Sequence, residues 1–145
     1  MIIREFQTID LIRVYEIEKE AFSNPYEKNI LQFLYNIGSG FLVAEDEKLI
    51  LGYIIFSLKE ENQGNIVSIA VAKKFRSQNI GSALLQTAIT LLKAFNTETI
   101  YLEVKSSKQG AINFYKKFGF KKKKVLKSCY EDGSDGISMH LRLKR

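Results

Sequence analysis

Residues 66–85 constrain the fold of this chain more than any other stretch. They begin with apolar and small residues typical of a buried strand, pass through a short polar turn, and continue as a helix with an apolar face. The turn carries Arg76, Asn79, Gly81 and Ser82 where the helix begins. A helix start offers unpaired backbone N–H groups and the positive end of the helix dipole, which together favour phosphate. We therefore expect a strand leading into a phosphate-binding turn, which suits a long phosphorylated ligand lying along the strand.

Length and composition favour one domain covering residues 1–145, long enough to bury a sizeable core. The single cysteine, Cys129, excludes an intramolecular disulfide and favours a reducing compartment. The longest mostly apolar run, residues 49–58, is shorter than the roughly 20 residues needed to span a bilayer. Arg4 and Glu5 interrupt the N-terminus too early for a signal peptide. We therefore expect a cytoplasmic protein with no membrane partner.

The formal net charge of +6 favours anionic partners, such as nucleic acid, the ribosome or a polyphosphate cofactor. Part of the excess lies in four consecutive lysines at residues 121–124, which we interpret first as a solvated strand. No zinc finger, helix-turn-helix or aromatic-basic recognition motif accompanies them, so nucleic-acid binding is the less favoured alternative. RNA binding through this run would predict an affinity that depends strongly on salt.

Hydrophobic periodicity and turn residues predict an α/β fold. The fold is a mixed, mostly antiparallel sheet of about seven strands with helices on both faces. The expected strands are residues 2–5, 41–45, 49–58, 65–72, 99–104, 120–126 and 137–143. The expected helices are residues 8–22, capped by Thr8, and residues 27–36, 80–95 and 107–118. The apolar face expected for the third helix consists of Ile80, Leu84, Ala88, Leu91 and Phe95, widened by Leu85 and Leu92.

Two motifs resemble landmarks of the GNAT family of N-acetyltransferases. The family's turn motif, Gln/Arg-x-x-Gly-x-Gly/Ala, stands here as Arg76-Ser77-Gln78-Asn79-Ile80-Gly81. Its second landmark, a strand and a helix ending in Tyr-x-x-x-Gly-Phe, stands here as residues 101–107 followed by residues 115–120. Both motifs lie in the family's order and spacing, and the element order agrees across nearly the whole chain. The resemblance implies a V-shaped opening between the fourth and fifth strands that accepts acetyl-CoA.

Within that family the chain looks most like protein N-terminal acetyltransferases, including the ribosomal-protein-alanine type. The resemblance rests on Leu-Glu-Val at residues 102–104, on the early loop with Phe22, Pro25 and Tyr26, and on the late tyrosine-bearing loop at residues 129–136. It implies an enzyme that acetylates the N-terminal α-amine of a protein or peptide, a ribosomal protein among the possible acceptors. We expect a monomer or weak dimer.

Three positions depart from the family pattern. Asn79 stands where the first motif glycine is usual, and asparagine tolerates a positive φ better than most residues. Lys108 stands where a cofactor-contacting asparagine is usual, so we carry no role over to it. Gly136 replaces an alanine, which we regard as a minor change.

The resemblance assigns acetyl-CoA to a strand and the turn that follows it, with no metal. Backbone groups of Ile69, Ala70 and Val71 would pair with the pantetheine arm, although these side chains would equally fill a core strand. The backbone N–H groups that would hold the pyrophosphate are those of Arg76, Ser77, Gln78, Asn79, Ile80, Gly81 and Ser82. One histidine, His140, and one cysteine do not make a tetrahedral zinc site credible.

Four side chains are candidates for the acceptor site. Glu103 is the candidate base, acting through a water, and Tyr115 the candidate acid toward the CoA sulfur. Tyr26 and Tyr130 would form the walls of a peptide groove. Without the resemblance, Glu103 reads as a solvent-facing carboxylate, Tyr115 as a core aromatic, and the other two as surface loop aromatics.

Three alternatives to N-terminal acetylation remain open at the level of sequence. A GNAT enzyme of this kind could acetylate a small amine, such as a polyamine, or a lysine side chain. The departures at Asn79 and Lys108 also leave open a CoA-binding module without turnover. An α-amine titrates near pH 8 and a lysine amine near 10.4, so a site with only a water-relayed glutamate favours the α-amine.

Overall fold

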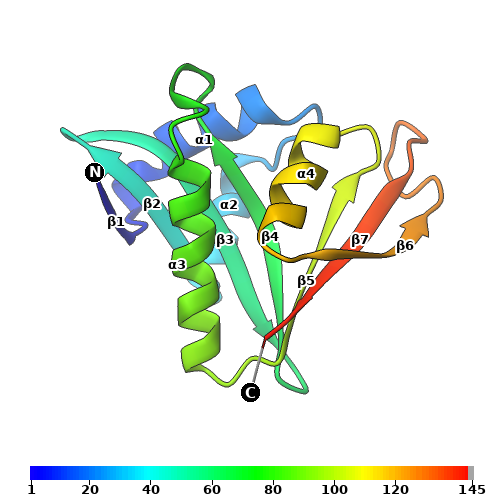
Figure 1. Cartoon of the computed structure of the whole chain (residues 1–145). Coiled ribbons are helices and arrows are strands. Elements are labelled where there is room, and N and C mark those ends of the chain that lie inside the picture. Colours follow the sequence, from blue (N-terminus) through cyan, green and yellow to red (C-terminus); the bar gives the residue numbers. More distant parts are fainter. Residues whose placement is uncertain (144–145) are drawn as a thin grey trace. The chain divides into compact units, whose positions relative to one another are not determined.

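The computed structural model describes residues 1–143, and it contains a mixed sheet with four α-helices (Figure 1). The strands are β1 (Ile2–Glu5), β2 (Gly40–Asp46), β3 (Leu49–Lys59), β4 (Gln63–Val71), β5 (Thr99–Lys105), β6 (Lys121–Leu126) and β7 (Gly136–Arg142). The helices are α1 (Leu11–Ala21), α2 (Lys28–Asn36), α3 (Ile80–Ala94) and α4 (Gln109–Lys117), with short 3-10 turns η1 (Thr8–Asp10) and η2 (Lys73–Phe75). The predicted α/β class is confirmed.

Hydrogen bonding orders the seven strands as β1-β2-β3-β4-β5-β7-β6. β4 pairs with β5 in parallel, through Gln63–Asn65 and Thr99–Tyr101. The pairs β1–β2, β2–β3, β5–β7 and β6–β7 are antiparallel. The sheet is therefore mixed and mostly antiparallel, as the sequence predicts.

The chain divides into two compact units. The first contains Met1–Ser57 and Ile66–Ala94, and the second contains Leu58–Asn65 and the chain from Phe95 onward. The single domain expected for residues 1–145 stays a prediction. In the part of the chain that the structure describes, no helix is long and apolar enough to cross a membrane.

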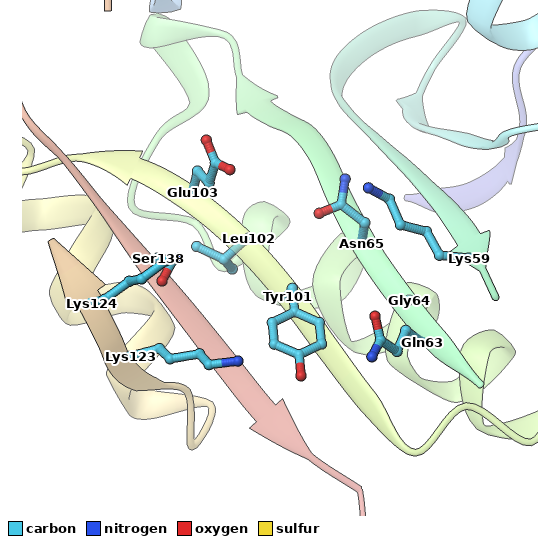
Figure 2. Close-up of a pocket in the computed structure, with 10 residues that line it drawn as sticks. All are labelled: Lys59, Gln63, Gly64, Asn65, Tyr101, Leu102, Glu103, Lys123, Lys124 and Ser138. Carbon is cyan, nitrogen blue, oxygen red and sulfur yellow. The ribbon is translucent and has the colours of Figure 1, made fainter. Parts of the chain in front are cut away.

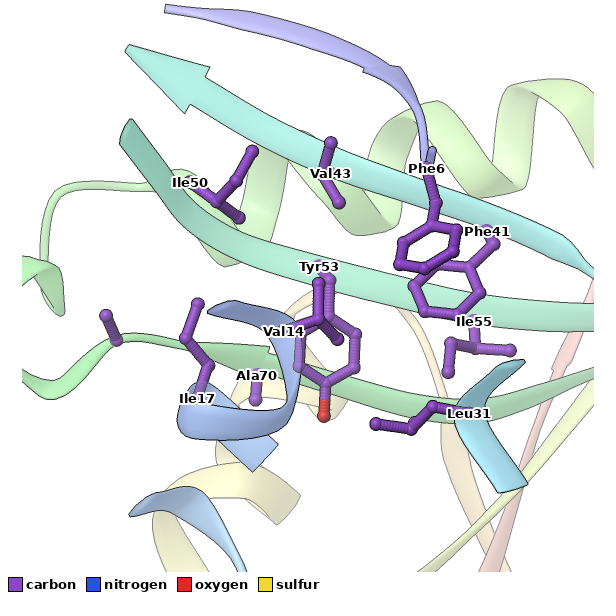
Figure 3. Packing of buried hydrophobic residues seen from close by; sticks show 11 residues of the cluster. Phe6, Val14, Ile17, Leu31, Phe41, Val43, Ile50, Tyr53, Ile55 and Ala70 are labelled. Atoms are coloured by element: carbon purple, nitrogen blue, oxygen red, sulfur yellow. The ribbon is translucent and has the colours of Figure 1, made fainter. Parts of the chain in front are cut away.

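The first unit packs helices on both faces of its strands (Figure 1). Side chains of successive strand residues point to opposite faces, so Phe41 and Val43 of β2 face α1 and α2, while Leu42 and Ala44 face α3. Figure 3 shows the core on the α1 and α2 side, where Phe6 stacks on Phe41 with ring centroids 4.0 Å apart. The members of this core cluster are Phe6, Val14, Ile17, Leu31, Phe41, Val43, Ile50, Tyr53, Ile55, Ala70 and Ala72.

The start of α1 differs from the prediction that Thr8 caps it. Thr8 begins the η1 turn, and the residue before α1 is Asp10. The Asp10 carboxylate accepts hydrogen bonds from the Gln7 backbone N–H at 2.8 Å and from the Arg4 guanidinium at 2.9 Å. Burial raises the pKa of Asp10, but these two partners outweigh it and hold the pKa below its ordinary value. The Asp10 side chain caps no backbone group of α1, so the ionic contact with Arg4 ties the start of the helix to β1 without replacing the predicted cap.

The buried face of α3 differs from the predicted one at three positions. It is centred on Leu85, Ala88 and Leu92 and also includes Ile89, which the sequence analysis did not place there. Leu91 lies at the edge of this face and is 38% exposed. Phe95 is 65% exposed because the helix has already ended at Ala94. The hydrophobic pattern predicted the helix correctly, but it did not predict which part of the apolar face packs against the sheet.

In the second unit, α4 follows β5 along the chain, and its Tyr115 packs against Phe120, which precedes β6. Ile100 and Leu102 are buried on one face of β5, whereas Tyr101 and Glu103 point to the other face. From α4, Ile112 and Tyr115 are buried. The Glu103 side chain therefore lies on the face of β5 opposite to the buried Ile100 and Leu102.

Candidate active site

The residues proposed for function divide between the two units. The first unit holds Tyr26, the three residues Ile69–Val71 of β4, and the turn at residues 76–82. The second unit holds Glu103 on β5, Tyr115 on α4 and Tyr130 in the loop between β6 and β7. Each group is described within its own unit.

The turn before α3 has the backbone form of an anion-binding loop. Ser77 and Asn79 adopt positive φ values of 67° and 64°, which confirms that asparagine takes the left-handed conformation usual for glycine here. The Arg76 Nε donates to the Val71 carbonyl at 3.0 Å, so its side chain ties the turn to the end of β4. Within residues 1–143, no hydrogen-bond partner is found for the backbone N–H groups of residues 77–82. These N–H groups are therefore available to a phosphate.

The β4 segment before this turn alternates in burial. Ala70 is buried in the core on the α1 side, while Ile69 and Val71 are half-buried on the opposite face. Gly52 lies against this segment, where a Cβ would meet the Ala70 carbonyl at 2.8 Å. The side chains of Ile69, Ala70 and Val71 thus take part in packing, as expected if the ligand is bound by backbone groups and not by these side chains.

The loop that carries Tyr26 is anchored by a buried carboxylate. Glu18 of α1 is 2% exposed, and its Oε2 accepts a hydrogen bond from the Tyr26 backbone N–H at 3.0 Å. Its Oε1 accepts from the Tyr53 hydroxyl and from Ser68 Oγ, the latter at 3.2 Å. Burial and the Glu18 charge raise the pKa of Tyr53 well above its ordinary value, so this phenol stays protonated and keeps donating. Sequence patterns gave no sign of these partners of Glu18.

Glu103 lies in a pocket of about 320 Å³ formed within the second unit (Figure 2). Its side chain is exposed, and it stands opposite Ser138 of β7 in the antiparallel register. Ser138 Oγ is buried and has no hydrogen-bond partner within residues 1–143. The pocket is lined by Lys59, Gln63, Gly64, Asn65, Tyr101, Leu102, Glu103, Lys123, Lys124 and Ser138. Apart from Glu103, the sequence analysis named no single residue of this lining as functional.

Tyr115 is a largely buried residue of α4. It is 8% exposed and packs edge-on against Phe114 and Phe120, with ring centroids 5.3 and 5.7 Å apart. Burial raises the pKa of its phenol above the ordinary value, so the hydroxyl is protonated at neutral pH and is a weaker acid than an exposed phenol. The ring also serves as part of the core.

Tyr130 lies in a tightly closed loop before β7. Lys105 Nζ lies 5.3 Å from the centroid of the Tyr130 ring and 3.1 Å from Asp132 Oδ2. A Cβ at Gly136 would lie 2.8 Å from Cys129 Sγ and 3.1 Å from the Tyr130 ring. The change from alanine to Gly136 is therefore not minor in packing terms, because it allows this loop to sit close to β7.

The other departure, Lys108, is the residue that precedes α4. Its backbone N–H donates to the Lys105 carbonyl at 3.0 Å, and its side chain caps no backbone group of the helix. Among the described residues, no group of three or more His, Cys, Asp and Glu side chains could hold a metal ion.

Comparison with known proteins now gives the family. The sequence model described as the acetyltransferase (GNAT) family matches residues 11–120. An uncharacterized N-acetyltransferase of Methanocaldococcus jannaschii is 43% identical over 141 residues, covering 96% of this chain and 90% of that protein. An N-alpha-acetyltransferase of Sulfurisphaera tokodaii is 36% identical, covering 94% of this chain and 90% of that protein.

A solved structure agrees with the fold and with the resemblance seen in sequence. The crystal structure of the ribosomal-protein-S18-alanine N-acetyltransferase from Escherichia coli superposes with a TM-score of 0.90. The two proteins are 25% identical, and the match covers 99% of this chain and 94% of that one. The resemblance stated from the two motifs is confirmed. The chain belongs to the acetyltransferase (GNAT) family and is an acetyl-CoA-dependent N-acetyltransferase.

Proposed function

We propose that this enzyme transfers the acetyl group of acetyl-CoA to the N-terminal α-amine of a protein or peptide. The observation that carries the proposal is an exposed carboxylate, Glu103, in a pocket of about 320 Å³ lined mostly by polar side chains. The likeness to an N-alpha-acetyltransferase and to a ribosomal-protein-alanine enzyme supports the same acceptor class.

Acetyl-CoA would bind to the first unit. The backbone of Ile69, Ala70 and Val71 would pair with the pantetheine arm, and the N–H groups of residues 77–82 would receive the pyrophosphate. The Arg76 N–H, which the resemblance included, already donates to the Lys73 carbonyl at 3.4 Å. The unpaired N–H groups at the start of α3 and the positive φ of Asn79 support this assignment. Arg76 would hold the turn against β4 rather than bind phosphate, because its Nε already donates to the Val71 carbonyl.

The transfer would proceed directly from thioester to amine. Glu103, through a water, accepts a proton from the α-ammonium, and the neutral nitrogen attacks the thioester carbonyl carbon. The tetrahedral intermediate collapses with cleavage of the C–S bond. Tyr115 donates its phenolic proton to the departing sulfur, and the nitrogen passes its second proton through solvent to the phenolate. The products are free CoA and the acetylated amine, and Glu103 releases the first proton to solvent. Tyr26 and Tyr130 would flank the acceptor chain.

The pKa values of the possible acceptors favour the α-amine over a lysine side chain. Deprotonating a lysine amine at neutral pH costs about 3 kcal/mol more than deprotonating an α-amine, because their pKa values differ by more than two units. A single exposed glutamate offers little means to offset that difference. A lysine or polyamine acceptor would therefore react more slowly in this site.

Exchange of the two catalytic candidates tests the mechanism. We expect Glu103→Gln and Tyr115→Phe each to lower kcat by about 100-fold or more, since each removes a proton-transfer group. The dissociation constant for acetyl-CoA, measured by calorimetry, should stay within about twofold, because neither side chain binds the cofactor in this scheme. Glu131→Gln, an exposed change in the loop before β7, is the matched control and should leave turnover unchanged. Unchanged turnover in both test variants would refute the assigned roles.

A further inference from the structure

The run of four lysines does not form a regular solvated strand. β6 pairs with β7 through Lys122 opposite Met139 and Lys124 opposite Ser138, with a register shift between them. Two residues of β6 thus occupy the space of one, which defines a β-bulge and re-aims the side chain of the extra residue. Strict alternation would place Lys123 and Lys124 on opposite faces. With the bulge, both line the pocket that contains Glu103 (Figure 2).

The pocket has an excess of positive charge at fixed positions. Lys59 of β3 joins Lys123 and Lys124 in its lining, against the single carboxylate of Glu103. Within residues 1–143, no ion pair is found for any of these three lysines. Lys123 Nζ lies 4.9 Å from the centroid of the Tyr101 ring, which holds the ammonium group over the pocket.

Neutral hydrogen-bonding groups lie between these charges. Asn65 and Gln63 of β4 contribute side-chain amides, and Ser138 contributes the buried hydroxyl that lacks a protein partner. A carboxylate entering the pocket could accept hydrogen bonds from the hydroxyl and an amide while facing the lysines. The pocket lining is therefore complementary to an acceptor that carries a positive amine and a negative carboxylate, the amine facing Glu103 and the carboxylate facing the lysines.

From this arrangement we propose that the pocket selects acceptors that carry a carboxylate beside the reacting amine, namely chains with Asp or Glu among their first two residues. The proposal rests on the proposed function. The α-amine lies toward Glu103, and the acidic side chain lies toward Lys59, Lys123 and Lys124. A basic residue at the same position meets three like charges and is disfavoured.

A matched peptide set tests this selectivity. Three peptides differ only in the second residue, which is Glu, Gln or Lys, and α-amine acetylation is followed by mass spectrometry. We expect wild-type kcat/KM for the Glu peptide to exceed that for the Lys peptide by about fivefold or more, with Gln between, as three exposed charges would give. The ratio should shrink as salt is raised, because exposed charges are screened.

Charge reversal assigns the effect to the pocket. Lys123→Glu and, on another strand, Lys59→Glu should each reduce or invert the preference. Lys122→Glu changes the net charge equally, but its position pairs with Met139 on the other face, so it should keep the wild-type ratio. Equal acetylation of all three peptides, or an equal effect of Lys122→Glu, would overturn the proposal while leaving the proposed function standing. No α-amine acetylation of any peptide would overturn both.

Discussion

At the scale of single residues, the Glu18 carboxylate is the best-defined polar feature of the first unit. It joins α1 to β3 through Tyr53, to β4 through Ser68, and to the Tyr26 loop through a backbone N–H. A carboxylate is an acceptor only, and here all three of its partners are donors. The three donated hydrogen bonds offset part of the cost of burying this carboxylate.

Replacing this carboxylate with an amide tests that description. In Glu18→Gln, the side-chain NH₂ group must face a donor in either orientation, so we expect the free energy of unfolding to fall by about 1 to 3 kcal/mol. Urea denaturation measures the loss, with Glu16→Gln as the control, since Glu16 lies on the same helix and makes only an exposed ion pair with Arg13. An unfolding midpoint equal to that of the wild-type protein would contradict the assigned role of Glu18.

Local sequence rules predicted some residues of the candidate site and missed others. The exposure of Glu103 follows from strand alternation, and the positive φ of Asn79 follows from the conformational tolerance of asparagine. Two of the three partners of Glu18, Tyr53 and Ser68, lie 35 and 50 residues away along the chain, so no local pattern reveals them. Likewise, the grouping of Lys59 with Glu103 depends on strand pairing.

At the scale of elements, the loop between β6 and β7 depends on one glycine. The Cβ of an alanine at Gly136 would approach Cys129 Sγ to 2.8 Å, closer than real Cβ contacts. The Tyr130 ring lies 3.1 Å from the same point, so the Cys129 side chain and the Tyr130 ring must move to accept the added methyl group. Because Tyr130 is proposed to flank the acceptor, this packing should be visible in peptide kinetics.

A pair of variants measures the effect of this contact. We expect Gly136→Ala to raise the KM for a peptide acceptor by about threefold or more, as overpacking displaces Tyr130, with little change in the KM for acetyl-CoA. Adding Cys129→Ala removes the nearest clashing atom and should restore much of the peptide KM. A double variant no better than Gly136→Ala alone would show that the contact with Cys129 is not the cause.

The boundaries of the elements were more predictable than their packed faces. β1 matches its predicted range, and α3 begins at Ile80 as expected, because alternation and turn residues are local signals. The exposure of Leu91 could not be predicted, since the sheet decides which part of a broad apolar stripe is covered. The bulge at Lys123 has no signature in a run of identical residues.

At the scale of the whole molecule, the residues proposed to bind acetyl-CoA and those proposed for catalysis belong to different compact units of the chain. The first unit carries the turn assigned to acetyl-CoA, and the second carries Glu103, Tyr115 and the lysine-lined pocket. The net charge of +6 is not spread evenly over the surface, because three of the lysines that contribute to it line one pocket. In the proposed selectivity, the choice of acceptor depends on these three lysines alone.

The most direct test of the central claim is to identify which amine is acetylated. Purified enzyme and acetyl-CoA would be incubated with free-N-terminus peptides that each contain one internal lysine, together with spermidine, and the products mapped by tandem mass spectrometry. We expect acetylation at α-amines, with rates that depend on the first two residues and with internal lysines largely unmodified. Modification confined to lysine or spermidine would contradict the claim that the α-amine is the acceptor.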